Sequence, residues 1–245
     1  MSILSVKNLE KKFGDLTVLK NISFNINDGE IISIIGSSGS GKSTLINLIP
    51  RFYDVTEGRV LVDGVDVREM TQKEVRSRLG YVPQKGVLFS GTIDSNIRYG
   101  KTDISETEVK EAAEVAQATE FIDAKPEQYA SPIAQGGTNV SGGQKQRLSI
   151  ARAIAKKPEI FIFDDSFSAL DFKTDSTLRK ALKEHTKDAT TIIVAQRIST
   201  ILNADKIIVL DDGHMAGIGT HGELMKNCEV YRQIAMSQLS EEELA

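Results

Sequence analysis

Nine residues, Gly36-Ser37-Ser38-Gly39-Ser40-Gly41-Lys42-Ser43-Thr44, set the architecture expected of the whole chain. The apolar run 31–35 before them is typical of a buried strand, and the run 45–49 after them is compatible with a helix. Glycines let the main chain of such a loop curl around phosphate oxygens, and the N–H groups that open the helix face an anion. The pattern G-x-x-x-x-G-K-[ST] therefore predicts a phosphate-binding P-loop rather than a chance glycine–serine linker.

Two side chains of this loop have the chemistry that a bound nucleotide requires. Lys42 can reach the β- and γ-phosphates, and the Ser43 hydroxyl can ligate Mg²⁺. The loop thus predicts a nucleoside triphosphate with Mg²⁺ as its ligand.

Composition limits the class of partner. The chain has 245 residues and a formal net charge of -4, so no broad basic face is expected and nucleic acid is a poor candidate. Cys228 is the single cysteine, which excludes an intrachain disulfide. No apolar run approaches the roughly 18 residues that cross a bilayer, so any membrane span must come from elsewhere.

Apolar patterning around the P-loop predicts an α/β core. Three strands are expected within residues 4–35, with Val18 among the alternating apolar positions of the second. Phe13 precedes that strand in a polar setting, where it could stack on a purine or equally be an ordinary core residue. Later strands are predicted at 58–64, 79–82, 160–163, 190–195 and 206–210. Capping boxes predict helix starts after Thr71, Ser105 and Thr220.

Residues 87–155 have a different residue pattern, because strand patterns are absent and helix-forming residues predominate. We expect a helical insert in the α/β core. The insert contains Ser141-Gly142-Gly143-Gln144 directly before a helix predicted over residues 146–155. A second helix N-terminus of this kind is a second anion site, which a P-loop protein rarely needs unless a second nucleotide is involved.

Two carboxylates end the apolar run 160–163, at the strand end where ligands of open α/β sheets bind. Asp164 can hold Mg²⁺ through its water shell, and Asp165 can contact the attacking water. Without a P-loop upstream, the pair would more simply indicate a helix-capping turn. Gln84 also ends a predicted strand, and its amide oxygen can bind Mg²⁺ or water or remain a solvated loop amide.

In this order and spacing, the motifs resemble the nucleotide-binding domain of ABC transporters over nearly the whole chain. The turn at residues 141–144, hereafter the signature motif, distinguishes that family from other P-loop enzymes. The run Leu88-Phe89-Ser90-Gly91-Thr92-Ile93 with Asn96-Ile97 looks like the exporter branch. The resemblance implies two domains paired head to tail, with each ATP between one P-loop and the other domain's signature motif.

The resemblance implies a single nucleotide-binding domain over residues 1–245. Its P-loop NTPase (RecA-like) core and antiparallel β subdomain would occupy 1–86 and 156–245, and its helical subdomain 87–155. The residues implied to bind ATP are Phe13, Val18, Gly36, Ser37, Ser38, Gly39, Ser40, Gly41, Lys42, Ser43, Thr44, Gln84, Ser141, Gly142, Gly143 and Gln144. Those implied to hold Mg²⁺ are Ser43, Gln84 and Asp164, and those implied in catalysis are Lys42, Gln84, Asp165 and Gln196. The implied partners are a second nucleotide-binding domain and a transmembrane domain at the cytoplasmic face of the cell membrane.

Two catalytic positions are among those that depart from the family's pattern. Asp165 stands where active members carry a glutamate as general base, and Gln196 stands where they carry a switch-loop histidine. Aspartate withdraws the carboxylate by roughly 1.5 Å, and a misplacement of about 1 Å can cost around a hundredfold in rate. Glutamine offers a neutral N–H donor without the proton-handling range of imidazole. We therefore expect ATP binding with poor hydrolysis, as in one subunit of heterodimeric ABC exporters.

Other functions fit the same motifs. One is a regulatory ATP-binding module that never hydrolyses, and the retained carboxylate of Asp165 argues mildly against it. Another is the separate ATPase subunit of an importer, whereas the run 88–97 favours a domain from a longer half-transporter. ABC proteins that act on ribosomes or DNA usually join two such domains or insert long coiled coils, and this sequence shows neither.

Overall fold

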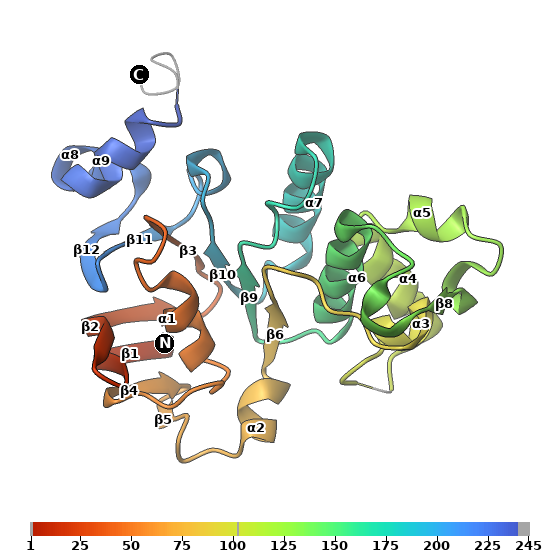
Figure 1. Ribbon diagram of the computed structural model, residues 1–245, viewed down its shortest axis with the longest axis horizontal. Helices are drawn as coiled ribbons and strands as arrows, with labels where there is room; N and C mark the ends of the chain where they lie inside the picture. The colour runs from red at the N-terminus through yellow and green to blue at the C-terminus, as the bar shows by residue number, and fades with distance from the viewer. Residues whose placement is uncertain (1, 102, 240–245) are drawn as a thin grey trace. The chain divides into compact units, whose positions relative to one another are not determined.

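The computed structural model describes residues 2–101 and 103–239. These residues form two units, which we describe separately (Figure 1). Residues 2–79 and 188–239 make up the P-loop unit, and residues 80–187 make up the signature unit.

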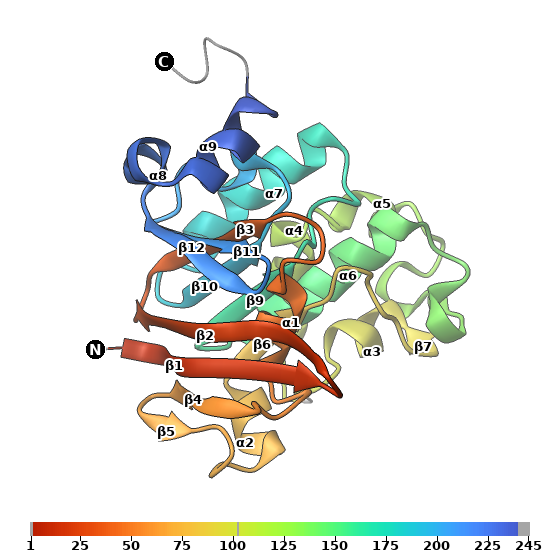
Figure 2. The same cartoon turned by 60° about the vertical axis from the view of Figure 1, so that its left-hand side comes forward.

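An antiparallel sheet opens the P-loop unit (Figure 2). Its strands, in spatial order, are β2 (Leu16–Asn27), β1 (Ser2–Phe13), β4 (Glu57–Val62) and β5 (Val65–Asp66). The predicted alternation holds at Ile22, Phe24 and Ile26, which are buried. It fails at Val18, which is only half-buried, because the pairing of β1 with β2 shifts register and Leu19 takes the core position instead.

The strand that leads into the P-loop lies in a second set of strands. β3 (Ile31–Gly36) is flanked by β10 (Thr190–Val194) and β11 (Lys206–Asp211), and both run parallel to it. All but the end residues of β3 are buried, as expected of a parallel strand covered on both faces. The sequence did not predict β12 (His214–Gly219), because its residues are only partly buried and show no apolar run.

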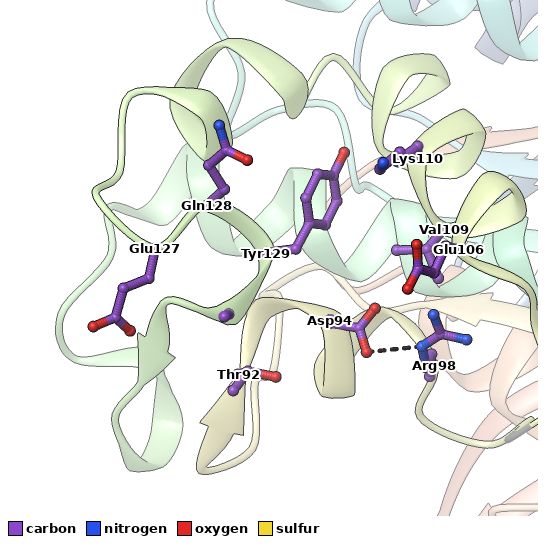
Figure 3. A pocket seen from close by; sticks show the side chains of 10 residues that line it. Thr92, Asp94, Arg98, Glu106, Val109, Lys110, Glu127, Gln128 and Tyr129 are labelled. Carbon is purple, nitrogen blue, oxygen red and sulfur yellow. Dashed lines mark hydrogen bonds and ion pairs between the residues drawn. The ribbon is translucent and has the colours of Figure 1, made fainter.

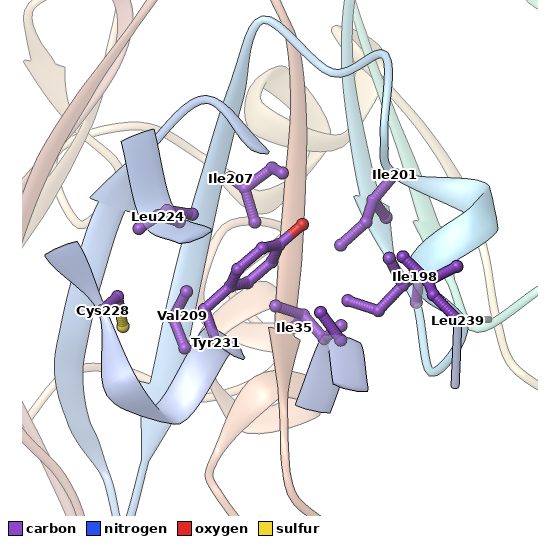
Figure 4. Close-up of a cluster of buried hydrophobic side chains, with 11 residues drawn as sticks. Ile35, Ile198, Ile201, Ile207, Val209, Leu224, Cys228, Tyr231 and Leu239 are labelled. Carbon is purple, nitrogen blue, oxygen red and sulfur yellow. The ribbon is translucent and has the colours of Figure 1, made fainter. Parts of the chain in front are cut away.

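Helices complete the P-loop unit. They are α1 (Lys42–Leu48), α2 (Gln72–Ser77), η3 (Ile198–Thr200), α8 (His221–Asn227) and α9 (Glu229–Met236). The capping boxes predicted at Thr71 and Thr220 are both present. The predicted single C-terminal helix is instead two helices, because Cys228 adopts an extended conformation between them. Tyr231 of α9 is fully buried in the apolar cluster that joins these helices to β11 and β3 (Figure 4).

The signature unit carries the predicted helical insert. Its elements are β6 (Leu79–Val82), β7 (Gly91–Thr92), α3 (Ile93–Ile97), α4 (Glu106–Val115), α5 (Thr119–Asp123), η1 (Gln128–Ala130), β8 (Pro132–Ile133), η2 (Gln135–Gly137), α6 (Gly142–Ala155), β9 (Ile160–Asp164) and α7 (Phe172–His185). The expectation that strands vanish here is wrong in one place, since β7 and β8 form a short antiparallel ladder. These strands have two residues each, too few to produce an alternating pattern.

The fold is thus the predicted α/β P-loop NTPase fold with an antiparallel β subdomain. Within the described parts of the chain, we find no helix that is both long and apolar enough to cross a membrane.

Candidate functional site

Backbone packing explains the glycines at both ends of the P-loop. A Cβ atom at Gly36 would lie 2.1 Å from the carbonyl oxygen of Leu210 on the neighbouring strand β11. Gly41 has a left-handed backbone (φ +99°), and a Cβ there would lie 2.6 Å from the side chain of Leu19. Both positions therefore require glycine before any ligand is considered.

The loop gathers hydrogen-bond donors around its own carbonyl groups. The Lys42 ammonium donates to the carbonyl oxygens of Gly36 and Ser37, at 2.7 Å each. Gly41 is the N-cap of α1, and as a glycine it has no side chain that could cap the first turn. A positive side chain and the N-terminus of a helix therefore meet at one loop, which is the arrangement that binds phosphate.

A hairpin turn from the far end of the sequence braces the P-loop. The Gly213 N–H donates to the Ser40 carbonyl oxygen at 3.3 Å, and the Gly213 carbonyl accepts from the Lys20 N–H at 2.8 Å. A Cβ at Gly213 would lie 2.3 Å from the Val18 carbonyl oxygen. The backbone of Val18, a predicted site residue, therefore packs directly against this turn. Gly213 is not among the predicted site residues, because nothing local in the sequence connects it to the P-loop.

Phe13 lies at the surface, which answers the question of whether it belongs to the core. Its side chain is 41% exposed, and its ring contacts Tyr53 edge-on with the centroids 5.2 Å apart. The Lys11 ammonium lies 4.7 Å from the centre of the same ring. An exposed aromatic ring of this kind has a face that can stack on a planar ligand.

Gln196 follows β10 and is held through its backbone by the C-terminal segment. The Gln238 amide donates from Nε2 to the Gln196 carbonyl oxygen, and its Oε1 accepts from the Ile198 N–H, both at 2.9 Å. One side chain thus clamps both ends of the segment 196–198. No local pattern pointed to Gln238, because the clamp joins residues about 40 positions apart.

The signature unit brings three predicted site residues together at the end of β9. Asp164 and Asp165 are 6% and 7% exposed, and the Gln84 amide nitrogen donates to Asp165 Oδ2 at 2.9 Å. Asp165 has a left-handed backbone (φ +46°), a conformation that aspartate adopts more readily than most residues with a side chain. The Gln84 side chain therefore binds the carboxylate that was predicted to contact the attacking water.

A tyrosine that sequence analysis missed contacts Asp164. The Tyr81 hydroxyl lies 3.4 Å from Asp164 Oδ2, within hydrogen-bond range. Burial raises the pKa of Tyr81, and the nearby Asp164 charge raises it further. The phenol therefore stays protonated at neutral pH and acts as a donor toward the carboxylate.

The signature motif forms the start of α6, four residues earlier than the predicted helix start at 146. Ser141 is the N-cap: its hydroxyl accepts from the Gln144 N–H, and the Gln144 side chain accepts from the Ser141 N–H at 3.0 Å. A Cβ at Gly142 would contact nothing within 4 Å, so the helix start is open at this point. As predicted, Ser141 and Gly143 lie at a helix N-terminus.

The donor chemistry of the predicted Mg²⁺ ligands suits that ion. Ser43, Gln84 and Asp164 supply hydroxyl, amide and carboxylate oxygens, the hard donors that Mg²⁺ prefers. Ser43 lies in the P-loop unit, and the other two lie in the signature unit. No group of three or more His, Cys, Asp or Glu side chains suited to a metal occurs in residues 2–101 and 103–239. Mg²⁺ bound with a nucleotide needs no such cage, because phosphates and water complete its shell.

A separate cavity of about 460 Å³ lies in the signature unit between α3, α4 and η1 (Figure 3). Its walls carry acidic and basic side chains, and Asp94 and Arg98 form an ion pair there with a 2.7 Å separation. None of the predicted site residues lines it. This cavity is therefore distinct from the candidate nucleotide site.

Residues 19–168, more than half of the chain, match the profile of the family described as ABC transporter. The chain is 48% identical over 227 residues to an uncharacterised ABC transporter ATP-binding protein of Mycobacterium tuberculosis, with 91% of this chain and 39% of that protein covered. It is 45% identical over 240 residues to heavy metal tolerance factor 1 of Caenorhabditis elegans, with 98% of this chain and 30% of that protein covered.

A solved structure supports the same assignment. The chain superposes on a bacterial Atm1-family ABC exporter with ATP bound, at a TM-score of 0.93 and 39% identity, with 97% of this chain and 42% of that chain covered. The chain therefore spans between 30% and 42% of the length of these proteins. On the strength of the profile match and of these identities, the chain belongs to the ABC transporter family and has the fold of its nucleotide-binding domain.

Proposed function

We propose that the chain is the ATP-binding motor domain of an ABC-type exporter, coupling ATP binding and hydrolysis to transport. The similarity to an exporter with ATP bound supports this function, as does 46% identity to a Bacillus subtilis protein described as a candidate multidrug export ATP-binding/permease protein. A transmembrane domain supplies the membrane span, and the motor domain lies at the cytoplasmic face of the membrane. The net charge of -4 gives no support to a nucleic-acid partner.

The P-loop residues bind ATP in this proposal. Lys42 and the N-terminus of α1 bind the phosphates, and the exposed ring of Phe13 stacks on the purine. Ser43, Gln84 and Asp164 hold Mg²⁺, which neutralises charge on the phosphates when bound. Residues 1–245 act as one nucleotide-binding domain, with 87–155 as its helical subdomain.

Asp165 and Gln196 make the chain's own P-loop site slow. Asp165 acts as the general base toward water, but it is one methylene shorter than glutamate and already accepts a hydrogen bond from Gln84. Gln196 offers the γ-phosphate a neutral donor only. The contact between Gln84 and Asp165 is the observation that supports this assignment, because it occupies one oxygen of a carboxylate that is already one methylene shorter than that of glutamate.

The signature motif serves a different ATP. In the head-to-tail pair, Ser141–Gln144 complete the active site of a second, non-identical nucleotide-binding domain. The open N-terminus of α6, where a Cβ at Gly142 would contact nothing, leaves room for a phosphate to approach. The partner's site then carries most of the turnover.

Single-turnover hydrolysis by the 245-residue chain tests the slow site. We expect Asp165→Glu with Gln196→His to raise the hydrolysis rate at least about tenfold. Glutamate extends the carboxylate by one methylene, and histidine restores the imidazole at the γ-phosphate. Lys42→Ala is the control and should abolish the gain. If neither wild type nor the double variant releases phosphate while both bind ATP, the chain is a regulatory ATP-binding module instead.

A mixed assay with the partner subunit tests the division of labour. We expect Ser141→Arg in this chain to abolish turnover, because it blocks the partner's ATP, and Asp165→Asn to leave most turnover intact. The opposite pattern would show that the fast and slow sites are assigned the wrong way round.

A further inference from the structure

Gln146 is a buried polar residue on the signature helix α6 that the proposed chemistry does not use. Its side chain is 1% exposed, although glutamine is normally found at the surface. The Nε2 group donates to the Pro83 carbonyl oxygen at 3.0 Å, and Oε1 accepts from the Gly86 N–H at 2.8 Å. One amide group thus binds the main chain on both sides of Gln84.

The main chain of the Gln84 loop also lies directly against the backbone of α6. A Cβ at Gly86 would come within 2.8 Å of the Lys145 carbonyl carbon and oxygen, so any larger residue would push the loop away from the helix. Farther along, the Arg152 guanidinium donates to the Val87 carbonyl oxygen at 2.8 Å. The loop is therefore fastened to α6 by backbone packing and by side chains from two positions on that helix.

We propose that Gln146 is a positioning residue that locks the Gln84 loop to the signature helix, so that Gln84 and the signature motif move as one body. This inference rests on the proposed function, because it assigns Gln84 to the chain's own ATP and the signature motif to the partner's ATP. Contact of a nucleotide with Ser141–Gln144 then changes the position of Gln84, and through it that of Asp165, which Gln84 binds at 2.9 Å. Gln146 links the two ATP sites of the pair without touching either ATP.

Amide hydrogen exchange on the 245-residue chain tests the lock directly. We expect Gln146→Leu to speed exchange of the Gly86 N–H by about tenfold or more, because that group loses its acceptor. Gln146→Glu keeps an acceptor for Gly86, and its buried carboxyl when protonated can still donate to the Pro83 carbonyl oxygen, so it should restore most of the protection. Ser149→Ala is the matched control on the same helix face: its buried hydroxyl has no hydrogen-bond partner among the described residues. An unchanged Gly86 exchange rate in Gln146→Leu would overturn the proposal.

A double-mutant cycle distinguishes positioning from a general loss of stability. If Gln146 acts through Gln84, Gln146→Leu lowers kcat at little cost in KM for ATP and has no further effect in a Gln84→Ala background. Equal losses of kcat in both backgrounds would show that Gln146 acts independently of Gln84, against the proposal. A chain that binds ATP without hydrolysing it would refute the proposed motor function alone, since the exchange measurement needs no turnover.

Discussion

Individual glycines of the P-loop are required for two different reasons. Gly39 and Gly41 have left-handed backbones, whereas Gly36 has no positive φ and is constrained by packing, since a Cβ there would lie 2.1 Å from the Leu210 carbonyl oxygen and 2.7 Å from the Ser40 hydroxyl. The motif spacing identifies these positions but does not separate conformational need from close packing. Because Gly36 has no positive φ, a substitution there measures the contribution of packing to the free energy of unfolding.

We expect Gly36→Ala to lower the free energy of unfolding by about 3 kcal/mol, because its Cβ would overlap the backbone of β11. Gly142→Ala is the matched control, since a Cβ there would contact nothing within 4 Å, and its effect should stay below about 1 kcal/mol. Urea unfolding midpoints measure both effects. Equal midpoints for the two variants would contradict the packing argument.

Two kinds of hydrogen bond stabilise the helices and loops: caps at helix starts, and side chains that clamp the backbone of a loop. Five capping boxes open α2, α3, α4, α6 and α8 among the described residues. Two glutamine side chains, those of Gln146 and Gln238, each bind the backbone of a loop through both amide atoms. The caps act within one helical turn, and the clamps act between elements far apart in sequence.

The Gln238 clamp predicts a local change in the Gln196 segment. We expect Gln238→Ala to speed amide exchange at Ile198 by about tenfold, because the Ile198 N–H loses its acceptor. Gln233→Ala is the control on the neighbouring turn: it removes an exposed glutamine that bonds only within α9, to Glu229, in the contacts described. Faster exchange in both variants would indicate fraying of the C-terminal helix rather than loss of the clamp.

The start of α4 predicts a pH dependence of stability. The Lys157 ammonium, followed by the Ser105 N–H and hydroxyl, lowers the pKa of Glu108 from 4.5 to about 2. Because the folded-state pKa is depressed, this stabilisation is present above pH 4.5 and is lost as the pH falls through about 2.

We expect Glu108→Gln to shrink the loss of thermal stability between those two pH values, since glutamine keeps the cap but not the ion pair. Glu106→Gln removes a charge from the same helical turn and keeps the Lys157 pair, so its pH dependence should stay close to that of wild type. Melting temperatures across this pH range make the comparison. The same dependence of melting temperature on pH in the two variants would contradict the role given to the Glu108–Lys157 pair.

In the whole molecule, the predicted site residues are divided between two units, and the signature unit interrupts the P-loop unit along the chain. The P-loop unit contains Lys42 and Gln196, and the signature unit contains Gln84, Asp164, Asp165 and the signature motif. A ligand that binds the folded chain alone shifts the unfolding equilibrium of the molecule by mass action.

Mg²⁺-ATP at 100 times its Kd should stabilise the fold by about 2.7 kcal/mol, which raises the melting temperature by roughly 5–10 °C for a chain of this size. Lys42→Ala should remove most of that shift, because it deletes the ammonium that we propose binds the phosphates. Lys180→Ala removes the same charge from an exposed position on α7 and should keep the full shift. Loss of the shift in both variants would mean that net charge, not the P-loop, accounts for binding.

Much of the fold was predictable from local patterns. The P-loop strand and helix, the three predicted capping boxes and the buried strand that ends at Asp164 are all present. The errors have specific causes: β7 and β8 are too short to show periodicity, β12 has no apolar run, and the register shift beside β2 moves Leu19 into the place of Val18. The site residues were named from motifs, and their roles remain predictions.

By itself, the sequence determined those features that arise within a few residues: strand and helix periods, caps, and glycines that permit a tight loop. Folding in three dimensions established the contacts that hold the site residues, such as Gln84 with Asp165 across 81 positions and Gln146 with Gly86 across 60. The reason is physical. Each of these bonds joins a polar group to a partner whose position depends on the packing of distant elements, and no local pattern carries that information.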